Sequence, residues 1–117
     1  MEQQIERIKT MEKKMDEASP EIKQFSLCLE KMEKLYDDMK LLSEYYSGEW
    51  KKDYEADEQG KIPKDLKRGV LSQDALYNLL GDYNQLGKKM FELGEKMTGS
   101  CSSNLTNRSV FIFLILL

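Results

Sequence analysis

The sequence predicts an all-α protein, built as a three-helix bundle or antiparallel helical hairpin with coiled-coil-like packing. Three observations predict this class. The 117-residue chain has only two prolines, good helix formers such as Glu, Lys, Leu and Met dominate it, and its apolar residues recur at steps of three and four. A chain of this length has room for one domain with a modest core. We therefore expect a single helical domain over residues 1–97, followed by a tail of different composition.

Two helices are expected before residue 47, at about residues 2–18 and 20–46. A proline disfavours helix at the residue before it and is tolerated at the first position of a new helix, so Ser19-Pro20 is predicted to separate the two. Ser19 is then placed to cap the second helix. The apolar seam, the row of side chains expected to face the core, is Ile5, Ile8, Met11, Met15 and Ala18 in the first helix. In the second it is Ile22, Phe25, Leu29, Met32, Tyr36, Met39, Ser43 and Tyr46.

The second helix has the widest apolar stripe, because Cys28, Leu35 and Leu42 form a column beside its seam. A stripe of that width can be buried against two neighbours, which favours this helix as the central one. Ser47-Gly48 is a predicted helix stop, and residues 47–71 are expected to form a linker.

The third helix is expected at about residues 72–97, with Ser72 as its capping residue. Its seam is Leu76, Leu79, Tyr83, Leu86, Met90, Leu93 and Met97. Gly87 and Gly94 lie in one column beside this seam. Two interpretations remain open: the missing side chains let a partner helix approach closely, or the helix is simply weak, since each glycine costs about 1 kcal/mol relative to alanine.

The tail, residues 98–117, is rich in serine and then apolar over residues 110–117. An apolar run this short falls far below the roughly 20 residues of a membrane-spanning helix. Three interpretations remain open. The tail is unstructured or foreign to the fold, as a frameshifted or read-through end would be; it makes a weak membrane or partner contact; or it packs on the domain.

Composition restricts the possible functions. The chain has no histidine, which removes the commonest general base and a common zinc ligand. Its net charge of −3 comes from interleaved charges of both signs, which does not suit binding to nucleic acid. Cys28 and Cys101 lack metal-ligand spacing, and the charged start of the chain lacks an apolar stretch. We expect a cytoplasmic protein with no secretory signal, no disulfide, no catalytic residue and no cofactor.

The linker carries the most specific residues of the chain: Trp50, then DYEADEQG over residues 53–60, PKDLKRGVLS over 63–72 and DALYNLL over 74–80. In these residues the chain resembles domain-of-unknown-function family 4298, a family of small bacterial helical proteins. The resemblance extends over residues 1–97, and the tail departs from it. It implies a small, mostly helical protein and assigns no activity.

Acidic side chains at alternate positions of the linker suggest a calcium loop, because hard cations prefer oxygen ligands. Asp53, Glu55 and Asp57 have this spacing. However, Gly60 falls two positions late for the EF-hand pattern, and Lys64 occupies the position of its bidentate glutamate. We therefore predict no metal site, and expect these acids to be solvated or paired with nearby basic residues.

Aromatic and basic residues complete the possible interaction surface. Aromatic side chains around the end of the second helix can anchor an interface or cover the end of a small core. The basic patch includes Lys67 and Arg68, and so few charges would give only weak phosphate contact. The full set is Tyr45, Tyr46, Trp50, Asp53, Tyr54, Glu55, Asp57, Lys67 and Arg68.

Two function classes follow from the sequence. The leading hypothesis is a non-catalytic cytoplasmic protein that associates with itself or with another helical protein, because its apolar stripes exceed what a small bundle buries. The alternative is a small ligand- or cation-binding domain, or a small enzyme, that uses the acidic and aromatic residues 45–58.

Overall fold

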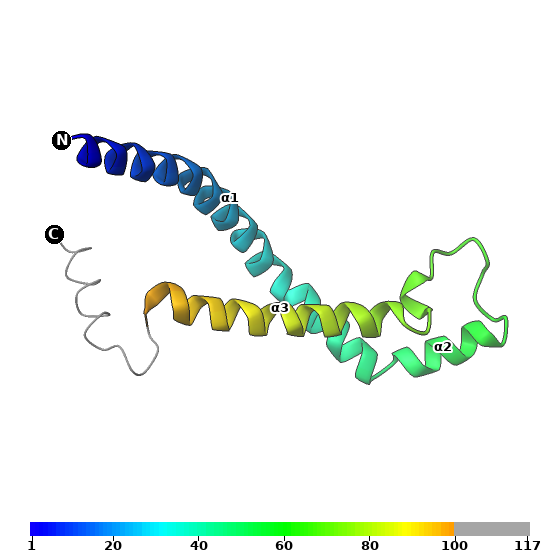
Figure 1. The fold of residues 1–117 in the computed structure, drawn as a ribbon. Coiled ribbons are helices and arrows are strands. Elements are labelled where there is room, and N and C mark those ends of the chain that lie inside the picture. The colour runs from blue at the N-terminus through cyan, green and yellow to red at the C-terminus, as the bar shows by residue number, and fades with distance from the viewer. Residues whose placement is uncertain (100–117) are drawn as a thin grey trace. The chain divides into compact units, whose positions relative to one another are not determined.

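The computed structural model of the chain describes residues 1–99. These residues form three α-helices and one short 3-10 helix without any strand, so the all-α class is confirmed (Figure 1). By their internal contacts they divide into two units, residues 1–44 and the part that begins at Tyr45. Apart from Thr98 and Gly99, the tail lies outside the described residues.

Helix α1 runs from Glu2 to Ser47 without interruption, so the predicted break at Ser19-Pro20 is wrong (Figure 1). Pro20 lies inside the helix, where it removes one backbone hydrogen bond. Ending the helix there would instead leave several N–H and C=O groups without intrahelical partners on each side. Strong helix formers on both sides of Pro20 favour the continuous helix, and Ser19 caps no helix.

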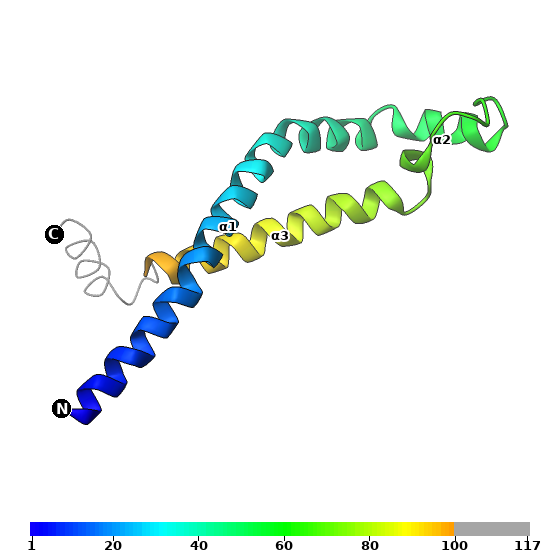
Figure 2. The ribbon, with the colours of Figure 1, turned by 90° about the horizontal axis from the view of Figure 1, so that it is seen from above.

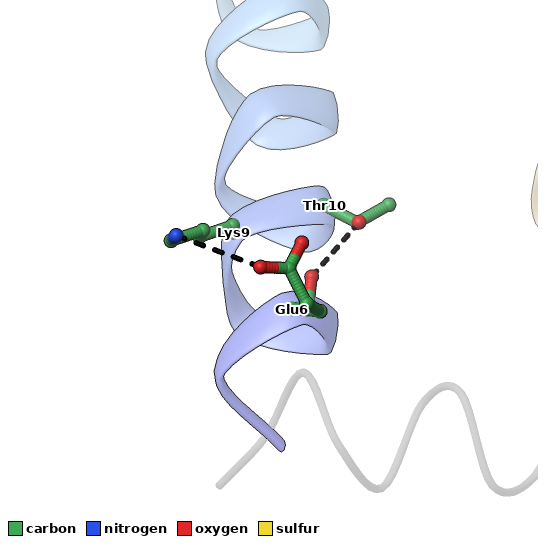
Figure 3. Close-up of polar contacts among 3 residues, drawn as sticks. All are labelled: Glu6, Lys9 and Thr10. Carbon is green, nitrogen blue, oxygen red and sulfur yellow. Dashed lines mark hydrogen bonds and ion pairs between the residues drawn. The ribbon is translucent and has the colours of Figure 1, made fainter. Parts of the chain in front are cut away.

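An exposed ion pair and a side-chain hydrogen bond stabilise the first turns of α1 (Figure 3). The amine of Lys9 lies 3.6 Å from a carboxylate oxygen of Glu6, and the Thr10 hydroxyl donates to the Glu6 carbonyl at 2.9 Å. The ion pair is exposed, so it contributes a few tenths of a kcal/mol. The backbone N–H of Ile5 donates to the carbonyl of Met1 at 3.0 Å, which closes the first helical turn.

The predicted linker contains a second helix, α2, from Trp50 to Glu58. α1 ends at Ser47, as the Ser47-Gly48 stop predicted. Gly60 lies two residues after the end of α2, and its φ of +74° is the left-handed conformation that glycine adopts most easily. There the N–H of Gly60 donates to the Asp57 carbonyl and that of Lys61 to the Ala56 carbonyl, each at 3.0 Å. This pair of bonds is a Schellman motif.

The chain then returns through a 3-10 helix, η1 (Gly69–Leu71), to α3 (Ala75–Thr98). η1 contacts both α2 and α3, and Figure 2 shows it between α2 and the start of α3. α3 begins three residues later than predicted, because Ser72 is extended at the end of η1. Its hydroxyl still accepts the N–H of Ala75 at 3.3 Å. α3 ends at Thr98 and is followed by Gly99, whose φ is +66°.

Few apolar side chains are buried in the described part of the chain: Met39 in α1, Leu71 in η1 and Leu76 in α3. The seam side chains of α1 from Ile5 to Phe25 are exposed, with 43–67% of the surface of each large one open to solvent. In α3, Leu79, Leu86, Leu93 and Met97 are exposed as well. None of the helices in residues 1–99 is long and apolar enough to cross a membrane.

The helix glycines beside the α3 seam have open space around them. A methyl group placed on Gly87 or Gly94 would meet no other atom within 4 Å. Within residues 1–99, the two glycines therefore do not mark a point of close helix packing.

Candidate functional site

Three aromatic side chains form a row along one side of the junction between α1 and α2, and we call them the aromatic row. Tyr46 lies in the last turn of α1, Trp50 begins α2, and Tyr54 follows one turn later. Their ring centroids are 5.2 Å apart between Tyr46 and Trp50 and 5.0 Å apart between Trp50 and Tyr54. The row stays on one face because Glu49, between the helices, keeps near-helical backbone angles. Ring pairs at these separations add stability beyond the burial of their area.

The aromatic row is held against the returning part of the chain. The indole N–H of Trp50 donates to the Val70 carbonyl in η1 at 2.8 Å. The ring of Tyr46 lies 6.4 Å from that of Tyr77, in the first turns of α3. These contacts join the end of α1, α2, η1 and the start of α3. The buried residues of this unit, Leu71 and Leu76, lie in η1 and at the start of α3, two of the elements that these contacts join.

A tyrosine–carboxylate hydrogen bond lies beside the aromatic row. The hydroxyl of Tyr45 donates to Asp53 at 2.6 Å, across the turn between α1 and α2. Burial is the largest cause that raises the pKa of Tyr45 to about 12, followed by this hydrogen bond and the charges of Asp53 and Glu49. The phenol therefore stays neutral and donating at physiological pH.

An ion pair closes the loop that connects α2 to η1. Arg68, just before η1, contacts the carboxylate of Asp57 near the end of α2. The side chains are 31% and 22% exposed, so the pair is only partly desolvated. We expect it to contribute about 1 kcal/mol, near the upper end for pairs reached by solvent. Arg68 is thereby turned toward Asp57, and it does not extend the predicted basic patch.

The remaining predicted site residues are not brought into this network. The side chains of Glu55 and Lys67 are exposed and make no hydrogen bond or ion pair with any described residue. The carboxylates of Asp53 and Asp57 are bound to different partners, Tyr45 and Arg68. Within residues 1–99, no three acidic, cysteine or histidine side chains converge in a way that could hold a metal ion.

Two shallow grooves flank the aromatic row. The larger, of about 460 Å³, is open to solvent and lined by Tyr46, Trp50, Lys51, Tyr54, Glu55 and Gln73. The smaller, of about 380 Å³, lies between Tyr46 and α3 residues 77–84. Enzyme and cofactor sites are usually enclosed and contain a few converging polar groups. These grooves are open, and each is lined by a single carboxylate, Glu55 in the larger and Asp82 in the smaller.

The sequence does not predict two contacts that position the aromatic row: the Val70 carbonyl that accepts from Trp50, and the ring of Tyr77 beside Tyr46. Val70 contributes through its backbone carbonyl, which carries no residue-specific signal. Tyr77 contributes through its ring. Its position at the start of the third helix is the one feature of the sequence that points to this contact.

Comparison with known protein families identifies the family of this chain. The family model described as Domain of unknown function (DUF4298) matches residues 8–93, which include most of α1, all of α2 and most of α3. No curated protein and no solved structure matches the chain. Because the match covers well over half of the sequence and the complete aromatic row, the chain belongs to the DUF4298 family.

Proposed function

We propose that this protein is a non-catalytic interaction protein of the cytoplasm, and that α1 forms a coiled coil with a helix outside its own chain. One observation carries the proposal: the apolar seam of α1 is exposed from Ile5 to Phe25. The unit formed by residues 1–44 consists of α1 alone, so the seam has no second element within its unit.

The exposed side chains have the spacing that a partner helix would need. Large apolar residues at steps of three and four along an α-helix form one continuous stripe. Ile8, Met15 and Ile22 are 55%, 60% and 67% exposed. A stripe of this kind is stabilised when a second helix covers it, because each large apolar side chain gains about 1.5–3 kcal/mol on full burial.

The arrangement around the aromatic row supports a structural role for residues 45–58. Asp53 and Asp57 could serve acid–base chemistry, but Tyr45 and Arg68 hold their carboxylates. The rings of the aromatic row and the Trp50 hydrogen bond instead join the elements of this unit. The exposed thiol of Cys28 supports a reducing location such as the cytoplasm.

The experiment that tests this proposal is site-specific photo-crosslinking in the cell of origin. A photoreactive residue replaces Met15, which is on the seam, or Lys13, which is exposed on the outward side of the same turns. We expect crosslinked products of higher mass from position 15 and not from position 13. Equal labelling at both positions, or none at position 15, would contradict the proposal.

A further inference from the structure

We infer that the seam of α1 is covered by a second copy of this chain, with the two α1 helices parallel and in register and with Arg7 of each copy paired with Glu12 of the other. The inference rests on the proposed function and specifies its partner. It is carried by the exposed seam together with the charged residues beside it.

The seven-residue repeat of α1 identifies the residues that flank the seam. Positions a and d of the repeat, conventionally written abcdefg, form the seam, and positions g and e lie on its two sides. With Ile8, Met15 and Ile22 at a, the d positions are Met11, Ala18 and Phe25. Arg7 is then at g and Glu12 at e.

Arg7 has no acidic partner within its own helix. Ion pairs along a helix form between residues three or four apart, and those residues are Gln3, Gln4, Thr10 and Met11. Neither Arg7 nor Glu12 forms an ion pair with any described residue. On the outward face, in contrast, Glu6 and Lys9 pair with each other (Figure 3). Lys9, which lies three residues before Glu12, is paired with Glu6 instead, so the charges of Arg7 and Glu12 are available to a partner in this structure.

In a parallel, in-register pair of helices, a g residue lies beside the e residue five positions later on the other helix. Arg7 of each copy then lies beside Glu12 of the other, which gives two attractive contacts by symmetry. The next g and e positions combine Lys14 with Ser19 and Glu21 with Ser26. No like charges oppose each other along this part of the seam.

An antiparallel pair is less complementary. Antiparallel helices place g positions opposite g positions, so Arg7 could reach Glu21 only in a register that sets Lys14 against Lys14 of the second copy. Like charges held opposite each other oppose association. The charge pattern thus favours the parallel arrangement.

Pro20 does not interrupt the inferred interface. It is at position f, on the side of α1 opposite to the seam, together with Glu6 and Lys13. Its ring therefore lies away from the second copy, and Ala18 and Ile22 continue the seam past it without a change of phase. α1 itself continues through Pro20 without a break.

The test uses sedimentation equilibrium of the full chain and three variants, R7E, E12R and the double variant R7E/E12R. We expect the unaltered chain to approach twice its mass of 13.7 kDa as its concentration rises. Each single variant turns two attractive contacts into repulsive ones, which should weaken association about tenfold. The double variant restores both contacts with their charges exchanged, so its association should return. Circular dichroism of each variant, recorded in parallel, verifies that α1 remains helical.

A mixing experiment makes the test specific. The R7E chain is acidic at both positions 7 and 12, and the E12R chain is basic at both. In an equimolar mixture, both contacts between unlike chains are attractive, so mixed dimers should form where each variant alone is weak. The matched control is E21R, which should leave association unchanged in the parallel arrangement. If E21R loses association while E12R keeps it, the inference is overturned in favour of an antiparallel pair.

The outcome also separates this inference from the proposed function. A chain that stays at 13.7 kDa at every concentration, while position 15 still crosslinks to a different protein, overturns the second copy and leaves the coiled-coil interaction standing. A monomeric chain without crosslinks at position 15 overturns both.

Discussion

Trp50 connects three parts of the unit that begins at Tyr45. Its ring contacts Tyr46 on one side and Tyr54 on the other, and its indole N–H reaches the carbonyl of Val70. A single side chain therefore ties the end of α1, α2 and η1 together, in a unit whose buried core is small. We expect the stability of this unit to be unusually sensitive to this one residue.

Replacing Trp50 with phenylalanine keeps an aromatic ring in the row and removes the hydrogen bond to Val70. We expect W50F to lower the free energy of unfolding by about 1–3 kcal/mol, from the lost bond and the smaller area of a half-buried ring. Urea unfolding followed by circular dichroism measures this change. The control is Y54F, which keeps its stacked ring and should change stability by less than about 0.5 kcal/mol. Equal effects of the two variants would show that the indole N–H contributes nothing.

Tyr45 provides a prediction about pH. Its folded pKa of about 12 lies above the value of about 10 for tyrosine in an unfolded chain. Its contribution to stability is therefore complete below about pH 10 and is lost as the pH rises through about 12. The tyrosinate absorbance of the protein minus that of Y45F should titrate near pH 12. D53N should lower the midpoint only in part, since burial is the largest cause of the shift. A midpoint near pH 10 would contradict the hydrogen bond seen here.

Replacing glycine is expected to have opposite effects on stability at the end of α2 and inside α3. Gly60 ends α2 with a positive φ that other residues adopt only with strain, whereas Gly81 lies inside α3 with open space around it. We expect G60A to destabilise the unit by about 1 kcal/mol and G81A to stabilise it by up to about 1 kcal/mol. Thermal unfolding of the two variants gives the comparison. A shift of both in the same direction would refute it.

The course of α1 through Pro20 could have been predicted from the seam. Ala18 and Ile22 are four residues apart, so the heptad repeat of the first half continues into the second without a phase shift. The Ser19-Pro20 dipeptide predicts the wrong boundary because it is a local signal, whereas the heptad repeat extends along the whole helix. A repeat that crosses a proline in phase favours a continuous helix.

The shorter elements carried weaker signals. The sequence predicts a linker where α2 lies, although Trp50 and Tyr54 are spaced by one helical turn and Gln59-Gly60 is a suitable stop. Ser72 was recognised as a capping residue, but the helix begins at Ala75 because η1 ends at Leu71. Turns of this kind depend on contacts between residues distant in the sequence, which a pattern along the chain does not contain.

The sequence predicts which residues form the candidate site, but only some of the contacts between them. The grouping of Tyr46, Trp50 and Tyr54 follows from their spacing, and the structure brings them together. The pairing of linker acids with basic residues was expected in general terms, and the structure identifies Asp57 and Arg68 as one such pair. The hydrogen bond from Trp50 to a backbone carbonyl could not be predicted, because every residue supplies that acceptor.

For the whole molecule, the main feature is the contrast between its two units. The unit that begins at Tyr45 has a small core, an aromatic row and a loop closed by an ion pair. Residues 1–44 form a single helix whose seam is exposed over its first half. A helix of this kind obtains most of its stability from packing against another element. The properties of α1 should therefore depend on its partner more than on the rest of its own chain.

Hydrogen exchange of backbone amides, measured by mass spectrometry at low and high protein concentration, tests this dependence. We expect amides in residues 2–25 to exchange fast at low concentration and to become protected as a second copy covers the seam. Amides in α2 and the first turns of α3 should exchange at the same rate at both concentrations, which provides the internal control. Exchange in residues 2–25 that does not change with concentration would contradict the self-association of α1.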